Sequence, residues 1–76
     1  MRFVTVKGNR FEVVSLREGD LRPGAVVRWK ESRKALRIVC FDGDDAILRN
    51  MRRPDLLEVA PRESVLEECW LLVPAQ

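Results

Sequence analysis

The stretch Ala35–Asn50 (ALRIVCFDGDDAILRN) decides the fold that we expect for this chain. Two apolar runs, residues 35–41 and 45–50, flank the turn Asp42-Gly43-Asp44, and glycine with aspartate is typical of tight turns. Runs of this length on either side of a short turn predict a β-hairpin. The apolar stretch 25–30 lies just before the hairpin, separated from it by the polar residues 31–34, and predicts a third strand. Together these segments predict a three-stranded antiparallel meander.

The expected register sorts the meander into an apolar face and a mixed face. We place Trp29 opposite Leu36 and Val27 opposite Ile38, and a three-residue turn at 42–44 sets the next pair of strands. Side chains alternate between the two faces of a strand, so one face is wholly apolar and is expected to lie in the core. This face comprises Val27, Trp29, Leu36, Ile38, Cys40, Ala46 and Leu48. The opposite face mixes basic and apolar residues, namely Arg28, Lys30, Arg37, Arg49, Val26, Val39 and Ile47.

The segment before the meander predicts a second hairpin, over residues 3–14. Gly8-Asn9 is a two-residue turn that tolerates positive φ, and it would place Val6 opposite Phe11 and Val4 opposite Val13. These four side chains then share one face, which we expect to be buried. Residues 15–24 (SLREGDLRPG) form a turn-rich loop between the hairpin and the meander.

The segment after the meander predicts one more short strand, over 56–60, and then a helix. Ser64 and Glu67 have the spacing of a capping box at a helix N-terminus. Apolar residues at 65, 66, 69, 72 and 73 follow with helical spacing, which predicts a helix over 64–72. A single helical turn followed by a strand at 70–73 is the alternative. Leu66 and Trp70 complete the expected core.

The order of elements resembles that of small SH3-like barrels, and most closely that of the small archaeal chromatin proteins. The stretch Glu18–Lys30 (EGDLRPGAVVRWK) is also similar to the opening of KOW-type barrels and of plasmid- or phage-encoded barrels. The resemblance implies a mainly β fold: a small SH3-like barrel made of the N-terminal hairpin and the meander, with a short C-terminal helix or helical turn. In the chromatin proteins the outer face of the triple-stranded sheet lies on DNA. The resemblance therefore implies that role for the mixed face, although this chain is less basic and has few lysines.

Length and composition are those of one small soluble domain spanning residues 1–76. Apolar residues make up 46% of the chain and charged residues 34%, with no histidine and no tyrosine. Two cysteines, Cys40 and Cys69, cannot supply the four ligands of a structural zinc site, and we expect both to be buried free thiols. The N-terminus has no signal-peptide pattern, so we expect a cytoplasmic protein.

Charge is distributed unevenly along the chain. Residues 1–53 contain 13 Lys and Arg against 7 Asp and Glu, whereas residues 54–76 contain Arg62 against five carboxylates. The expected register sets Arg28, Arg37 and Arg49 in one row across three strands. Like charges that face one another destabilise a sheet, so the row favours an anionic partner. The alternative is a solvated surface, with the register one residue out or the row neutralised by Glu12 and Glu31.

Two classes of function follow from this pattern. The first is a non-catalytic nucleic-acid-binding module, in which the arginines contact DNA or RNA phosphates and the valine–isoleucine patch contacts sugars. Arg52 and Arg53 would extend the same surface. The second is a protein-interaction module, such as a phage- or plasmid-type adaptor, inhibitor or assembly subunit, which binds an acidic protein surface or another copy of the chain. We expect no enzyme activity, no cofactor, no metal site and no membrane association. The aspartates at 42, 44 and 45 lack the spacing of a calcium loop.

Overall fold

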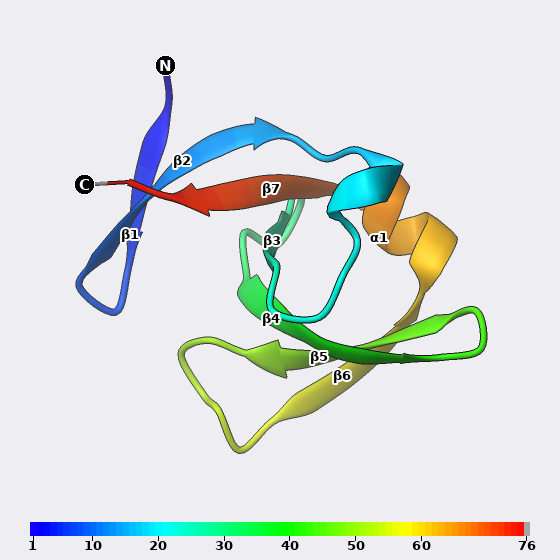
Figure 1. The fold of residues 1–76 in the computed structure, drawn as a ribbon. Coiled ribbons are helices and arrows are strands. Elements are labelled where there is room, and N and C mark those ends of the chain that lie inside the picture. The colour runs from blue at the N-terminus through cyan, green and yellow to red at the C-terminus, as the bar shows by residue number, and fades with distance from the viewer. Residues whose placement is uncertain (76) are drawn as a thin grey trace.

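The computed structural model describes residues 1–75, which form one antiparallel sheet of seven strands with a short helix near its end (Figure 1). The strands are β1 (Phe3–Val6), β2 (Asn9–Ser15), β3 (Val26–Trp29), β4 (Ala35–Asp42), β5 (Asp45–Asn50), β6 (Leu57–Pro61) and β7 (Cys69–Pro74). A 3-10 helix, η1 (Glu18–Asp20), lies in the loop after β2, and the α-helix α1 (Arg62–Glu68) precedes β7. The sheet curls into a half-barrel, which confirms the expected mainly β fold and small-barrel class.

The last strand joins the two halves of the sheet. The strand order is β1-β2-β7-β3-β4-β5-β6, so β7 lies between the N-terminal hairpin and the meander. Leu72 of β7 pairs with Val13 on one side and with Val26 on the other. The alternative of a helical turn followed by a strand is therefore confirmed, and the long helix over 64–72 is wrong. The capping box is wrong as well, because α1 starts after Pro61 and Ser64 lies inside it.

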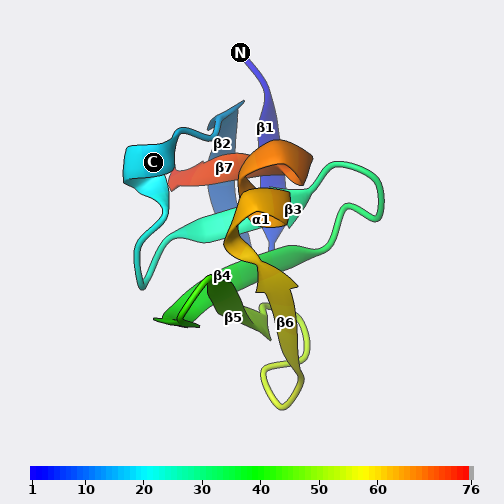
Figure 2. The same cartoon turned by 90° about the vertical axis from the view of Figure 1, so that its right-hand side faces the viewer.

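The curl of the sheet creates two hydrophobic clusters, one on each face of β3. The first contains Val27 and is closed by α1, whose Val65 is fully buried; Figure 2 shows this helix in front of the sheet. The second contains Val26 and lies under the N-terminal hairpin. Both faces of β3 are therefore covered. Buried residues that the sequence analysis did not place in the core are Leu21, Val26, Ala35, Ala60, Val65 and Leu72, whereas the expected burial of Cys69 is confirmed.

Two strand pairs are shifted by two residues from the predicted register. In the N-terminal hairpin the turn is Lys7-Gly8, both with positive φ, and Val4 lies opposite Phe11. Between β3 and β4, Val27 lies opposite Leu36. Because side chains alternate with a period of two, a two-residue shift leaves each residue on its predicted side of the strand. The predicted faces are therefore largely kept although the predicted cross-strand partners are wrong.

A β-bulge at Val39 changes the second half of β4. Ile38 pairs with Leu48 as predicted, but Cys40 then pairs with Ile47, so one residue of β4 has no counterpart. The inserted residue turns Cys40 outward, and its predicted place in the core is wrong. Phe41 packs against the first cluster in its place. The remaining predicted core residues are buried or packed against a cluster, except Trp70, which is half-buried.

Candidate nucleic-acid interface

The predicted row of three arginines forms only in part. Arg37 and Arg49 lie opposite each other across β4 and β5, as predicted. Arg28 instead lies opposite Ala35, because of the two-residue shift between β3 and β4. Val26 takes the place opposite Arg37, and its side chain is only 4% exposed. The prediction that Val26 is an exposed neighbour of the arginines is therefore wrong.

Arg37 and Arg49 each bind a backbone carbonyl of a nearby loop. Arg37 Nη1 donates a hydrogen bond to the Gly24 carbonyl oxygen at 2.9 Å, and Arg49 Nη1 donates to the Pro54 carbonyl oxygen at 2.6 Å. These two bonds fix the loops before β3 and before β6. The paired arginines therefore have a structural role, which explains how the sheet accommodates them side by side.

The other predicted site residues lie on β4, on β5 and in the loop after β5. Val39 is exposed at the bulge, and Ile47 is half-buried on the outward face of β5. Arg52 and Arg53 are exposed, and their backbone N–H groups both donate to Asn50 Oδ1 at 2.9 Å. This side chain to backbone bond is a standard device for closing a turn.

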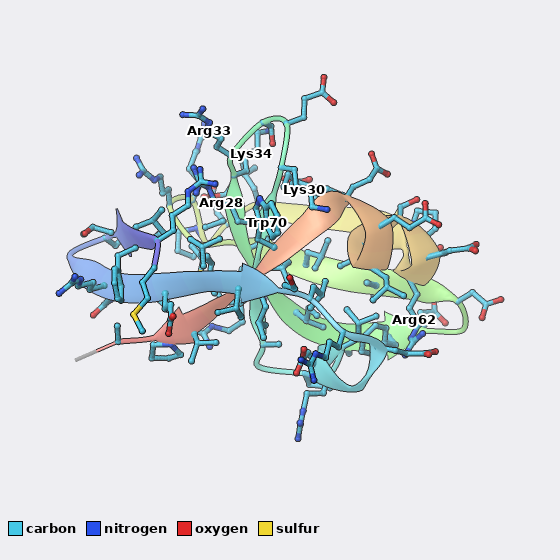
Figure 3. The ribbon with its side chains drawn as sticks, turned by 90° about the horizontal axis from the view of Figure 1, so that it is seen from above. Arg28, Lys30, Arg33, Lys34, Arg62 and Trp70 are labelled. Carbon is cyan, nitrogen blue, oxygen red and sulfur yellow. The ribbon has the colours of Figure 1, made fainter. Side chains whose placement is uncertain are left out.

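Arg28 is instead the centre of a different group of basic side chains. We call Arg2, Arg28, Lys30, Arg33 and Lys34 the basic cluster. Figure 3 shows the last four together around Trp70, on the side of the sheet away from Arg62. Burial lowers the pKa of the Arg28 guanidinium, and the charges of Arg2 and Arg33 lower it further. These two arginines therefore act on Arg28 as like charges.

The backbone explains why these side chains meet. Arg28 pairs with Trp70 across β3 and β7, and Arg33 follows in the loop after β3 with a φ of 63°. The Arg33 N–H donates to the Trp29 carbonyl at 2.9 Å, and the Trp29 N–H donates to the Lys34 carbonyl at 3.0 Å. The loop is thus closed tightly over the end of β3. Arg2 comes from the chain just before β1, where its carbonyl accepts a bond from Val13 at 2.8 Å.

Arg28 has unsatisfied hydrogen-bonding capacity. Its Nη1 atom is buried and has no hydrogen-bond partner within residues 1–75. A buried donor without a partner costs about 1–3 kcal/mol. The single ion pair among the described residues, Arg62 Nη1 to Glu18 Oε1 at 3.2 Å, lies elsewhere. Within residues 1–75, the basic cluster therefore forms no ion pair.

Lys30 marks the boundary of the basic cluster. Its Nζ lies 4.6 Å from the centre of the Trp70 ring and donates to the Glu67 carbonyl at 3.1 Å. Next to it, an open cleft of about 610 Å³ is lined by Glu31, Glu58, Glu67 and Glu68 as well as Lys30 and Lys34. The surface therefore changes from basic to acidic across Lys30 and Lys34.

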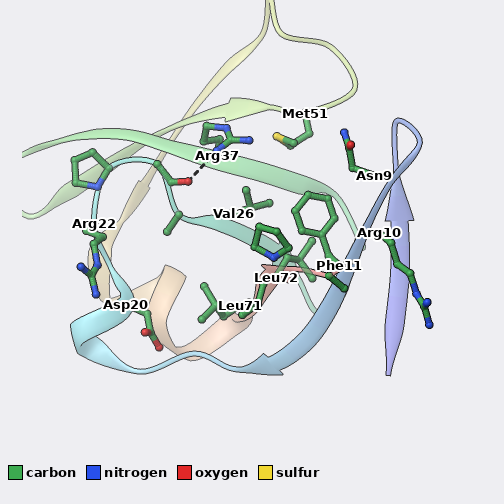
Figure 4. A pocket seen from close by; sticks show the side chains of 16 residues that line it. Asn9, Arg10, Phe11, Asp20, Arg22, Val26, Arg37, Met51, Leu71 and Leu72 are labelled. Carbon is green, nitrogen blue, oxygen red and sulfur yellow. Dashed lines mark hydrogen bonds between the residues drawn. The ribbon is translucent and has the colours of Figure 1, made fainter. Parts of the chain in front are cut away.

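A second and larger groove opens beside the N-terminal hairpin (Figure 4). Its volume is about 890 Å³, and the apolar residues Phe11, Val26, Met51 and Leu72 are among those lining it. The charged residues along it are Arg10, Arg22, Arg37 and Asp20. Arg10 stacks on Phe3 at 4.1 Å, and Arg37 is bonded to Gly24, so two of its three arginines already have neighbours.

Sequence reasoning identified Arg28 and Lys30 but missed Arg2, Arg33, Lys34 and Trp70. The signal for Arg33 and Lys34 was present, because both lie in the polar loop directly after Arg28 and Lys30. Trp70 was missed because its segment was assigned to a helix. Comparison with protein-family models, with curated proteins and with solved structures finds no match. Within residues 1–75 no helix is long and apolar enough to cross a membrane, and no three acidic or cysteine side chains are grouped to hold a metal ion.

Proposed function

We propose that this protein is a small, non-catalytic nucleic-acid-binding module that contacts phosphates through the basic cluster. The observation that carries the proposal is the state of Arg28: a partly buried guanidinium, subject to the like charges of Arg2 and Arg33, with one nitrogen lacking a partner. Like charges crowded together lower the stability of the free protein. An anion placed over the cluster relieves this repulsion and supplies the missing acceptor once the Arg28 side chain turns outward.

The geometry favours phosphate contact over reading of bases. Arginine suits phosphate because its planar fork of donors matches two phosphate oxygens. Lys30 lies over one face of the Trp70 ring, so this face is not available for a base to stack on. Phosphate contacts carry no sequence information directly. We therefore expect binding that depends on charge density and salt and is indifferent to sequence.

The test is the affinity for fluorescently labelled duplex and single-stranded oligonucleotides, measured by anisotropy over a series of salt concentrations. The variant R28Q/R33Q removes two charges from the basic cluster. The matched control, R10Q/R22Q, removes two charges from the groove beside the hairpin. For the first variant we expect the slope of log affinity against log salt to fall by about one for each phosphate that the protein no longer binds, with at most a small change for the control.

Two results would overturn this proposal. One is a wild-type protein that binds neither oligonucleotide at low salt. The other is an equal loss of affinity in both double variants, because that would show attraction by net charge without a defined surface. Circular dichroism of each variant checks that the fold is intact, which we expect because all four side chains lie outside the two hydrophobic clusters.

A protein-interaction role is the second candidate, and a separate surface favours it. The outward face of β5 and β6 exposes apolar side chains, with Leu57 54% and Val59 66% exposed. These residues are not part of the basic cluster. The two candidate functions therefore belong to different surfaces and can be tested independently. A cytoplasmic location stays a prediction.

A further inference from the structure

The two edges of the sheet differ in how they are protected. Edge strands have unpaired backbone groups, and charged side chains along an edge discourage pairing with another chain. At the β1 edge, Arg2 and Lys7 flank the strand, and the exposed Phe3 is covered by Arg10. Strand β6 has the sequence LEVAP, in which Glu58 faces the inner side and Pro61 ends the strand, and its outward apolar side chains Leu57 and Val59 are uncovered. Of the two edges, β6 is therefore the one open to a partner strand.

The backbone bonds at the ends of β6 show which groups face this free edge. The Arg62 N–H donates to the Asp44 carbonyl at 2.7 Å, and the Asn50 N–H donates to the Leu56 carbonyl at 3.1 Å. Hydrogen-bonded and non-hydrogen-bonded pairs alternate along an antiparallel ladder. Residues 56, 58, 60 and 62 therefore direct their backbone groups to β5. Leu57 and Val59 direct their N–H and C=O groups to the free edge, and Pro61 directs its carbonyl there.

An apolar row on the outer face of the sheet ends at this edge. Cys40 pairs with Ile47, and Ile47 pairs with Val59, so the three side chains cross β4, β5 and β6 in line. On one side of this row runs the line Arg37, Arg49, Leu57, and on the other runs the line Asp42, Asp45, Pro61. The face is thus divided into a basic, an apolar and an acidic row.

We infer that β6 pairs with β6 of a second copy of this chain, antiparallel and with Val59 opposite Val59 of that copy. A two-fold axis at this position makes the apolar row continuous across both molecules. It also brings the basic row of each copy into line with the acidic row of the other, because Leu57 then lies opposite Pro61. Each row of one copy therefore meets a matching row of the other copy: apolar with apolar, and basic with acidic. An interface between identical subunits requires such a self-complementary surface.

The hydrogen bonds and charges select this register. With Val59 at the centre, the two Val59 residues exchange both bonds, and each Leu57 N–H reaches a Pro61 carbonyl. Because proline lacks an N–H, each of the two Leu57–Pro61 pairs forms one hydrogen bond instead of two. A register shifted by two residues would set Glu58 against Glu58, and like charges directly opposite each other are destabilising. In the proposed register Glu58 lies opposite Ala60.

Sedimentation velocity over a range of protein concentrations tests the dimer. The variant V59K adds a charge to the 66%-exposed side chain at the centre of the pairing. The matched control, T5K, adds the same charge to an exposed residue of the β1 edge. We expect the dissociation constant of the dimer to rise about tenfold or more in V59K, equivalent to about 1.4 kcal/mol, and to stay near the wild-type value in T5K. A wild-type protein that stays monomeric, or equal weakening by both variants, would overturn the inference.

Cysteine cross-linking tests the register in a protein whose exposed native thiol is removed by C40S. Opposite residues of a hydrogen-bonded antiparallel pair have Cα atoms about 5.5 Å apart, within the range that a disulfide spans. V59C is therefore expected to form a covalent dimer under mild oxidation. L57C is the control, because its counterpart in the second copy lies roughly 14 Å away along the strand. Equal cross-linking of both variants, or of neither, contradicts the proposed pairing.

Discussion

Arg28 and Trp70 lie directly opposite each other across β3 and β7, although 41 positions separate them in the sequence. This pairing places the arginine beside the aromatic ring that supports Lys30 and beneath the loop that bears Arg33 and Lys34. Strand β7 thus positions the centre of the proposed interface as well as joining the halves of the sheet. The relationship also links binding to stability, because the same residue is crowded by like charges and lacks a hydrogen-bond partner.

The first prediction concerns this conflict between stability and binding. Arg28→Met keeps the apolar stem of the side chain and removes the unsatisfied donor and its charge. We expect the free energy of unfolding to be unchanged or to rise by up to about 1 kcal/mol. The buried donor without a partner lowers the stability of the folded protein, whereas the packing of the apolar stem is kept. Urea denaturation measures the stability, and the oligonucleotide titration on the same sample should show weakened binding. A decrease of more than about 1 kcal/mol would indicate that Arg28 is needed for folding.

The second prediction compares two neighbours on β4. Ile38 is 1% exposed in the first cluster, whereas Val39 is 38% exposed at the bulge. Ile38→Ala should lower the free energy of unfolding by about 2–5 kcal/mol, because apolar burial decreases and a cavity is left behind. Val39→Ala should change it by about 0.5 kcal/mol or less. Thermal or urea unfolding of both variants provides the measurement, and similar decreases in the two would show that the faces of β4 are misassigned.

The third prediction distinguishes the two thiols by their reactivity. Cys40 is exposed and Cys69 is 1% exposed. Burial raises the pKa of the Cys69 thiol, so that it stays protonated and unreactive at neutral pH. With a colorimetric thiol reagent, we expect one cysteine to react rapidly and the second only as the protein unfolds. Cys40→Ser should remove the rapid phase alone, and two rapid phases in the native protein would refute the assignment.

The fourth prediction is a loss of stability in alkaline solution. Burial raises the pKa of Cys69 from the ordinary 9.0 to about 12, and the nearby carboxylates of Glu68 and Glu58 contribute, while Lys30 opposes the shift. The unfolded chain therefore ionises this thiol at lower pH than the folded protein. The stabilisation is fully present below pH 9.0 and is lost progressively as the pH rises toward 12.

Urea denaturation at a neutral and an alkaline pH measures this effect. We expect the free energy of unfolding to fall by up to about 1.4 kcal/mol for each pH unit above the pKa of the unfolded thiol. Cys69→Ala should flatten the dependence, whereas Cys40→Ser should retain it. The same alkaline loss in Cys69→Ala as in the wild type would assign the effect to other groups.

The alternation of apolar and polar residues was sufficient to predict the fold class and most of the faces. Val27, Leu36, Ile38 and Leu48 are buried as expected. The cross-strand partners were harder to predict, because a shift of two residues preserves every face and leaves no trace in the pattern. In the N-terminal hairpin the predicted turn was Gly8-Asn9, but the observed turn is Lys7-Gly8, in which Lys7 as well as Gly8 adopts positive φ.

The parts of the candidate site that were missed depend on contacts between distant segments. Val26 is buried because the hairpin folds over the outer face of β3, and no local pattern indicates that both faces of a strand are covered. Trp70 reaches Arg28 only because β7 inserts between β2 and β3. The bulge at Val39 likewise reverses the side of the sheet to which Cys40 points. A prediction based on strict alternation of side chains along a strand does not include such an inserted residue.

The central position of β7 has a consequence for how the protein is made. During synthesis the hairpin and the meander emerge first, yet neither can join the other until residues 69–74 have left the ribosome. Pairings between segments so far apart in sequence form slowly, because the chain must give up the entropy of a long loop before the strands can pair. A nascent chain halted before Cys69 would therefore present two separate half-sheets with open edges, which is the form most vulnerable to proteases and to aggregation.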